Sequence, residues 1–202
     1  YRRRVDGMTS AIILGSNGQL GSDLLAHSPT DWRVFTHTRD DWDVTDHDGL
    51  EYLLEISPKV IINTTAFHNV DGCEKDPQLA EDVNSNAVGR LAEIANRIGA
   101  TLVHISTDYV FSGETDMPYL ESSQASPLNV YGKTKFHGEE KVRKIAESYY
   151  IIRISSVFGK AGASGKGGNF VYTMLNLGKT RDELNVIDDI TMSPTYTVDA
   201  SK

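Results

Sequence analysis

Short apolar runs alternate along the chain with longer segments in which apolar residues recur at helical spacing. Runs that are almost wholly apolar are typical of strands buried on both faces of a parallel sheet. Apolar stripes three or four residues apart are typical of amphipathic helices. The pattern predicts strands at 11–14, 33–36, 59–63, 101–105 and 150–154, and helices at 20–27, 86–98, 131–148 and 169–177. We therefore expect an α/β protein with a doubly wound parallel sheet.

Composition limits the classes of function. The 202 residues carry a formal net charge of −8, with 39% hydrophobic and 24% charged residues. A negative net charge disfavours nucleic acid as a partner, and no apolar run is long enough to cross a bilayer. Because Cys73 is the single cysteine, an intrachain disulfide is excluded, and a reducing cytoplasm is the expected location. The sequence has no cluster of cysteine and histidine residues that would predict a zinc site. Residues 1–7 are basic but lack the apolar run of a secretory signal, and we interpret them as a leader or remnant outside the fold.

A glycine-rich turn follows the first predicted strand, with the sequence Gly15-Ser16-Asn17-Gly18-Gln19-Leu20-Gly21. Glycines permit a tight turn and a close approach of the backbone, so that amides at the start of the next helix can bind a pyrophosphate. The spacing alone is a weak signal, and an ordinary glycine-rich turn is the alternative. Its place between a strand and a helix predicts a Rossmann-like dinucleotide-binding domain.

The segment after the second strand bears on the type of dinucleotide. An acidic residue there hydrogen-bonds the 2′-hydroxyl of NAD, whereas an arginine accepts the 2′-phosphate of NADP. Thr38 and Arg39 stand at the expected strand end and predict NADPH, while Asp40-Asp41 leaves NADH as an alternative. Asp43 and Val44 are expected to line the adenine pocket, or else to begin the next turn.

Two further segments carry candidate chemistry. Ser106-Thr107-Asp108-Tyr109 follows the fourth strand, and ligands of open parallel sheets lie outside the carboxyl ends of the strands. Tyr131 and Lys135 lie four residues apart on a predicted helix, a spacing that also occurs commonly on solvated faces. A phenol near an ammonium gives up its proton more easily, because the cation favours the phenolate. Thr107, Tyr131 and Lys135 would thus supply a hydroxyl donor, a proton source and a cation that also bonds the nicotinamide ribose.

The motifs, taken in order, resemble one family. They are Gly18-Gln19-Leu20-Gly21, Asn63-Thr64-Thr65-Ala66, Val70-Asp71, Ser106-Thr107-Asp108-Tyr109-Val110-Phe111, Asn129-Val130-Tyr131-Gly132 with Lys135, and Ser193-Pro194-Thr195. From about Ser10 to its last residue the chain is similar to dTDP-4-dehydrorhamnose reductase, an extended short-chain dehydrogenase/reductase.

The resemblance implies a reaction and a set of roles. The reaction is the NADPH- or NADH-dependent reduction of the C4 ketone of a dTDP-linked 6-deoxy-hexulose to dTDP-L-rhamnose, a polysaccharide precursor. Thr107, Tyr131 and Lys135 would be the catalytic set. Thr64, Thr65 and Ala66 would lie against the cofactor riboses and the nicotinamide. Tyr109 and Asn129 would face the sugar. Helices of this superfamily often pair across a dimer interface, so the resemblance also favours a homodimer.

Three departures from the family concern the substrate side. Ser156 stands where the family usually carries a tryptophan beside the sugar, and Asp188-Asp189 replaces the usual Asp-Gln. The family also continues for roughly another third of its length, on the scale of a small domain. We therefore predict a dinucleotide-binding domain at 8–160, with the catalytic Tyr131 and Lys135. Residues 161–202 would begin a C-terminal substrate domain, most of which is missing.

Two other functions stay open. One is a cofactor-binding regulatory subunit without catalysis, and the other is a nucleotide-sugar epimerase or dehydratase. Dehydratases use adjacent acidic residues after the threonine, whereas Thr107 is followed by Asp108 and then by Tyr109. That arrangement disfavours dehydration.

Overall fold

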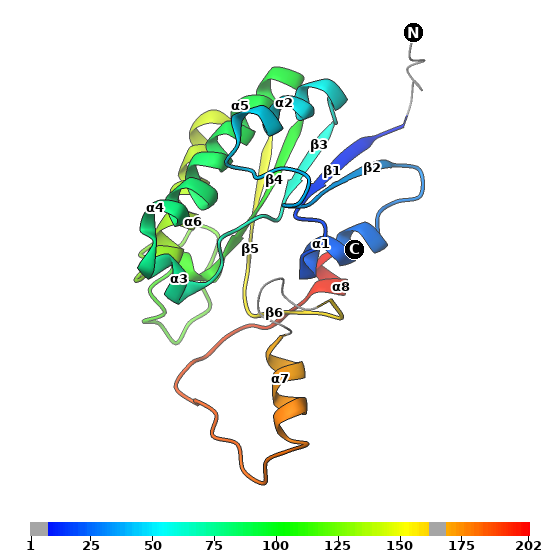
Figure 1. The fold of residues 1–202 in the computed structure, drawn as a ribbon. Helices are drawn as coiled ribbons and strands as arrows, with labels where there is room; N and C mark the ends of the chain where they lie inside the picture. The colour runs from blue at the N-terminus through cyan, green and yellow to red at the C-terminus, as the bar shows by residue number, and fades with distance from the viewer. Residues whose placement is uncertain (1–7, 162–168) are drawn as a thin grey trace.

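A five-stranded sheet forms the centre of the protein. The computed structural model describes residues 8–161 and 169–202, so the expected leader at 1–7 lies outside the described residues. All neighbouring strands are parallel, in the order β2-β1-β3-β4-β5 (Figure 1). The strands are β1 (Ser10–Leu14), β2 (Arg33–His37), β3 (Val60–Asn63), β4 (Thr101–Thr107) and β5 (Tyr149–Ile154). The predicted Rossmann-like α/β fold with a parallel sheet is confirmed.

Helices lie on both faces of this sheet. The helices of the described residues are α1 (Gln19–Ala26), α2 (His47–Ile56), α3 (Val70–Lys75), α4 (Pro77–Glu81), α5 (Ala87–Ile98), α6 (Val130–Ile145), α7 (Phe170–Leu177) and α8 (Thr197–Ala200), of which α7 does not pack on the sheet. A π-helical turn (Asp82–Asn86) joins α4 to α5, and a 3-10 turn (Asp108–Val110) follows β4. On one face α2, α5 and α6 pack side by side, while α1 lies on the other face with α8 against it (Figure 1).

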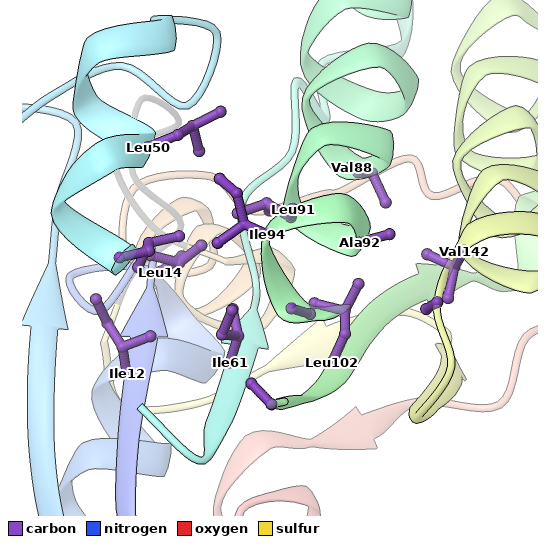
Figure 2. Packing of buried hydrophobic residues seen from close by; sticks show 14 residues of the cluster. Ile12, Leu14, Leu50, Ile61, Val88, Leu91, Ala92, Ile94, Leu102 and Val142 are labelled. Carbon is purple, nitrogen blue, oxygen red and sulfur yellow. The ribbon is translucent and has the colours of Figure 1, made fainter. Parts of the chain in front are cut away.

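The main hydrophobic core lies between the sheet and the layer of α2, α5 and α6. Side chains alternate across a strand, so Ile12 and Leu14 of β1 enter this core. Ala11 and Ile13 instead point to the face of α1, where they line a small pocket together with Leu24. Figure 2 shows the core residues from the strands meeting those of the helices, among them Leu50, Ile61, Val88, Leu91, Ala92, Ile94, Leu102 and Val142.

The register of the strands determines which residues project from the carboxyl edge of the sheet. Leu14, at the end of β1, pairs with His37 of β2 and with Asn63 of β3. Asn63 in turn pairs with His104, although β4 continues to Thr107. Thr107 therefore lies beyond the edge at which β1, β2 and β3 end, and level with Ile154 at the end of β5.

The predicted elements are present with ends that differ by a few residues, but several helices were not predicted. The helix α2 was missed because Asp48 and Gly49 occupy its first turn, and both residue types disfavour helices. The segment from α3 to the π-helical turn was missed because Asp76-Pro77 divides it into pieces too short to show a period.

The C-terminal segment is held to the first half of the chain by specific contacts. The short strand β6 (Val157–Phe158) pairs with β7 (Thr195–Tyr196), and the hydroxyl of Thr197 donates to the buried carboxylate of Asp23 on α1. The helix α7 stands away from the sheet, and none of its residues is buried (Figure 1). The domain boundary at 160 stays a prediction, and these contacts cross it.

Candidate active site

A cleft of about 1000 Å³ opens at the carboxyl edge of the sheet. Its lining runs from the glycine-rich turn after β1, past the ends of β3 and β4, to α6 and the start of α7. This volume is at the upper end of the range for small-molecule sites. The cleft is therefore large enough for an extended ligand such as a dinucleotide.

The glycine-rich turn is shaped by contacts that exclude side chains. The amides of Gly15 and Ser16 both donate to the carbonyl of His37, at 2.9 and 3.0 Å, and so tie the turn to β2. Gly15 has a φ of +81°, which favours glycine. A Cβ on Gly21 would lie 2.2 Å from the Gly15 carbonyl oxygen. Glycine at 21 thus permits α1 to start close against the strand end.

The N-terminus of α1 fits an anionic group. Gly18 is the N-cap, no side chain caps the helix, and its first turn has no acidic residue. The first hydrogen bond of the helix is made by the amide of Ser22 to Gly18, which leaves the amides of Gln19, Leu20 and Gly21 without a partner inside the helix. Those amides would hold the pyrophosphate of a dinucleotide. The Gln19 side chain is engaged elsewhere, since it donates to the Val157 carbonyl at 2.7 Å and accepts from Asn169 at 3.2 Å.

The segment after β2 already pairs its hydrogen-bond donors with carboxylates. The amide and hydroxyl of Thr38 donate to Asp41 at 2.7 and 3.0 Å, and these bonds lower the pKa of Asp41. Arg39 pairs with Asp43 at 3.0 Å. Burial raises the pKa of Asp43, but hydrogen bonds from Thr45 and the charge of Arg39 have the larger effect, so that the pKa is lowered overall. A 2′-phosphate at this place would compete with Asp41 for the donors of Thr38.

The end of β3 forms the floor of the cleft beside the glycine-rich turn. The Asn63 side chain is fully buried and accepts from the amide and hydroxyl of Thr65 at 3.1 and 2.6 Å. Thr64 donates to the Leu14 carbonyl at 2.7 Å. These bonds fix the polypeptide of 64–66 along the cleft, where all three residues line it.

The end of β4 presents a hydroxyl and a carboxylate to the cleft. Thr107 Oγ1 accepts from the amide of Tyr109 at 3.2 Å and donates to Asp108 at 3.1 Å. Ser155 donates to the second oxygen of Asp108 at 2.5 Å. The ring of Tyr109 meets that of Tyr131 edge to face, with centroids 5.5 Å apart. Asp108 is therefore held by two hydroxyls next to the candidate proton donor.

Tyr131 and Lys135 both line the cleft, but their electrostatics differ from the expectation. Burial raises the pKa of Tyr131 to about 12, although a hydrogen bond with Thr107 acts in the opposite direction. Lys135 donates to the Ile105 carbonyl at 2.7 Å, and burial lowers its pKa to about 8. The expected lowering of the Tyr131 pKa by Lys135 is therefore wrong for this structure, because the cost of burying the phenolate dominates.

The structure brings most of the predicted site residues together. Those that line the cleft are Gly15, Asn17, Gly18, Gln19, Leu20, Arg39, Asp43, Val44, Thr64, Thr65, Ala66, Thr107, Tyr109, Tyr131, Lys135 and Ser156. Gly21 and Thr38 are not among the lining residues: Gly21 packs against the Gly15 carbonyl, and Thr38 donates to Asp41. Asn129 is the N-cap of α6 and accepts from the amide of Gly132 at 2.8 Å, so its role toward the sugar stays a prediction.

Several lining residues were not foreseen in the sequence. They include Trp42 beside His37, Phe67 and Asn69 after β3, and Asn169, Phe170 and Thr173 at the start of α7. Asn169 carried one usable signal, because an asparagine ahead of an apolar helical stripe is typical of an N-cap. Its contact with Gln19 depends on tertiary structure and has no local signature.

Two further observations concern metals and membranes. Among residues 8–161 and 169–202, no group of three or more His, Cys, Asp or Glu side chains could hold a metal ion. Within the same part of the chain, no helix combines the length and the apolar character needed to span a bilayer.

Comparisons with known proteins agree with the motifs. The family model described as the RmlD substrate binding domain matches residues 9–202. The spore coat polysaccharide biosynthesis protein SpsK of Bacillus subtilis is 38% identical over 197 residues, which are 96% of this chain and 68% of that protein. The dTDP-4-dehydrorhamnose reductase of Escherichia coli is 39% identical over 189 residues, which are 91% of this chain and 62% of the enzyme.

A solved structure gives the same result for the fold. The dTDP-4-dehydrorhamnose reductase of Bacillus anthracis, in complex with NADP, superposes with a TM-score of 0.89 at 36% identity, covering 96% of this chain and 68% of that one. The chain thus spans about two thirds of the length of the relatives it matches. The motifs, the parallel sheet and these comparisons together show that the chain belongs to the RmlD substrate binding domain family, and the expected resemblance to dTDP-4-dehydrorhamnose reductases is confirmed.

Proposed function

We propose that this chain carries the cofactor-binding and proton-donating part of an NADPH-dependent reductase. Its reaction would be the reduction of the C4 ketone of a dTDP-linked 6-deoxy-hexulose to dTDP-L-rhamnose. The observation that carries the proposal is that Thr107, Tyr131 and Lys135 line the same cleft as the glycine-rich turn. The similar enzyme from Bacillus anthracis is in complex with NADP, which supports NADPH here.

Each side chain has a proposed role. When bound, the reduced nicotinamide supplies a hydride to the ketone carbon. Tyr131, with a pKa of about 12, stays protonated at neutral pH and holds the proton for the ketone oxygen. The Thr107 hydroxyl would hydrogen-bond the same oxygen, and the Lys135 ammonium would bind the ribose hydroxyls beside it.

Replacement of Tyr131 tests this proposal. Tyr131→Phe should lower turnover by roughly two to four decades, since it removes the general acid, while NADPH affinity stays near that of the wild type. The loss of NADPH absorbance upon addition of the dTDP-ketosugar measures turnover, and NADPH fluorescence measures binding. Tyr150→Phe is the matched control, because Tyr150 is 65% exposed on β5. Full turnover in Tyr131→Phe would remove Tyr131 from the proposed role.

The alternative functions give different results in the same assay. A dehydratase needs a carboxylate free to move protons, whereas Asp108 accepts hydrogen bonds from Thr107 and Ser155. An epimerase would consume no NADPH. A regulatory subunit would bind NADPH saturably without oxidising it. The expected homodimer and the cytoplasmic location stay predictions.

A further inference from the structure

Glu139 is a carboxylate with no exposed surface, although none of the proposed chemical roles uses it. It lies on α6 one turn after Lys135, and its side chain is 0% exposed. Burying a charge is costly unless the group is paired and hydrogen-bonded. A fully buried carboxylate beside the candidate active site therefore calls for a physical explanation.

Hydrogen bonds join Glu139 to three elements of the fold. Arg153 of β5 donates to both of its oxygens, at 2.8 and 2.6 Å, in a bidentate pair. Arg143 of α6 donates at 2.8 Å. Ser106 of β4 donates at 2.6 Å, and Ser106 immediately precedes Thr107. The carboxylate thus ties α6, β4 and β5 together at the carboxyl edge of the sheet.

The charge of Glu139 also acts on Lys135. Lys135 is 2% exposed, and burial lowers its pKa while the negative charge of Glu139 raises it. Other titratable groups near this pair are Arg143 and Arg153, which bond Glu139, Tyr131, one turn before Lys135, and His104. Burial and the charge of Lys135 hold the pKa of His104 well below its ordinary value. Burial raises the pKa of Glu139, but hydrogen bonds from Arg153 and Ser106 outweigh it, so the carboxylate is ionised.

We propose that Glu139 is a positioning residue of the proton-donating centre. It fixes the strand that carries Thr107 against the helix that carries Tyr131 and Lys135, and its negative charge keeps the Lys135 ammonium protonated at neutral pH. This inference rests on the proposed function, since it assumes that the Lys135 ammonium binds the cofactor ribose.

The pH dependence of NADPH affinity tests the electrostatic part. In the wild type, affinity should fall as pH rises through about 8, where Lys135 loses its proton. In Glu139→Gln the fall should begin about one pH unit lower, because the opposite charge is gone and two guanidinium groups remain. Glu140→Gln is the matched control, since Glu140 is exposed on the same helix and should leave the profile unchanged. NADPH fluorescence titrations at each pH provide the measurement without requiring turnover.

Two further variants test the role in positioning. Glu139→Asp retains the charge and should restore the pH profile of the wild type while its turnover stays low. Ser106→Ala removes one hydrogen bond and no charge, so it should fold and lower kcat roughly tenfold with a small change in the KM for NADPH. Equal pH profiles in the wild type and Glu139→Gln, or full kcat in Ser106→Ala, would overturn the inference. If the wild type binds NADPH but shows no turnover, the proposed function is overturned. The pH profiles of NADPH binding would still test whether the charge of Glu139 acts on Lys135.

Discussion

Lys135→Met replaces a buried ammonium by an apolar side chain of similar length, and we expect it to stabilise the fold at neutral pH. Burial lowers the pKa of Lys135 from 10.5 to about 8. The unfolded chain therefore binds this proton more tightly than the folded chain does, and stability rises with pH in this range. At pH 7 the lysine is charged in both states, and its burial costs about 3 kcal/mol.

The gain from the substitution should depend on pH. Removing the ammonium relieves this burial cost, but it also removes the hydrogen bond to the Ile105 carbonyl, which is worth about 1 kcal/mol. Lys135→Met should therefore be more stable than the wild type by about 2 kcal/mol at pH 7. Near pH 10 the lysine is neutral in the folded state and partly neutral in the unfolded state. The penalty there is below about 1 kcal/mol, and the gain should vanish.

Urea unfolding at pH 7 and at pH 10 measures this difference. Lys133→Met is the control, because Lys133 is exposed on the same helix and its replacement should change stability by less than about 0.5 kcal/mol at either pH. Equal or lower stability of Lys135→Met at pH 7 would refute the reasoning, as would a gain that persists unchanged at pH 10. The same variant should lose turnover, so the lysine would be kept at a cost in stability.

Two other substitutions probe the cofactor side of the cleft. Gly21→Ala would place its Cβ 2.2 Å from the Gly15 carbonyl oxygen, so we expect a loss of about 1–3 kcal/mol in urea unfolding and weaker NADPH binding; unchanged values would contradict the geometry. Asp41→Asn should raise the affinity for NADP relative to NAD by roughly two- to fivefold, because it removes an anion from the donors of Thr38. Calorimetric titration with both dinucleotides measures the ratio, Asp40→Asn is the control, and an equal response of the two variants would contradict a specific role of Asp41.

The predictable parts of the fold are those that a short stretch of neighbouring residues determines. The run 11–14 is buried in the sheet, and the glycines after it occupy the turn that their lack of a side chain permits. Tyr131 and Lys135 could be placed on one helix from their spacing alone. The rule that ligands of parallel sheets lie at the carboxyl ends of the strands placed Thr107 near a ligand, while its meeting with Tyr131 and Lys135 was implied by the family resemblance.

The parts that were not predictable depend on burial and on distant partners. The pKa of Tyr131 is set mainly by desolvation, which no spacing reveals. Asn129 has the residue type expected of a sugar contact, yet the same amide suits the N-cap of α6. Glu139 and its neighbour Glu140 look alike in the sequence, although only Glu139 is enclosed by arginines. For Tyr131 and Glu139 the deciding information lies in the tertiary structure, whereas for Asn129 two roles suit the same residue type.

The side chain of Gln19 bonds Val157 and Asn169, which follow it by 138 and 150 positions in the chain. Thr197 reaches 174 positions back to Asp23. These contacts begin on the helix that would hold a pyrophosphate, so we expect the segment that carries Val157, Asn169 and Thr197 to unfold together with that helix. A ligand that binds at the N-terminus of this helix in the folded state would also stabilise the C-terminal segment by mass action. The predicted boundary at residue 160 thus separates two parts of the chain that these hydrogen bonds join.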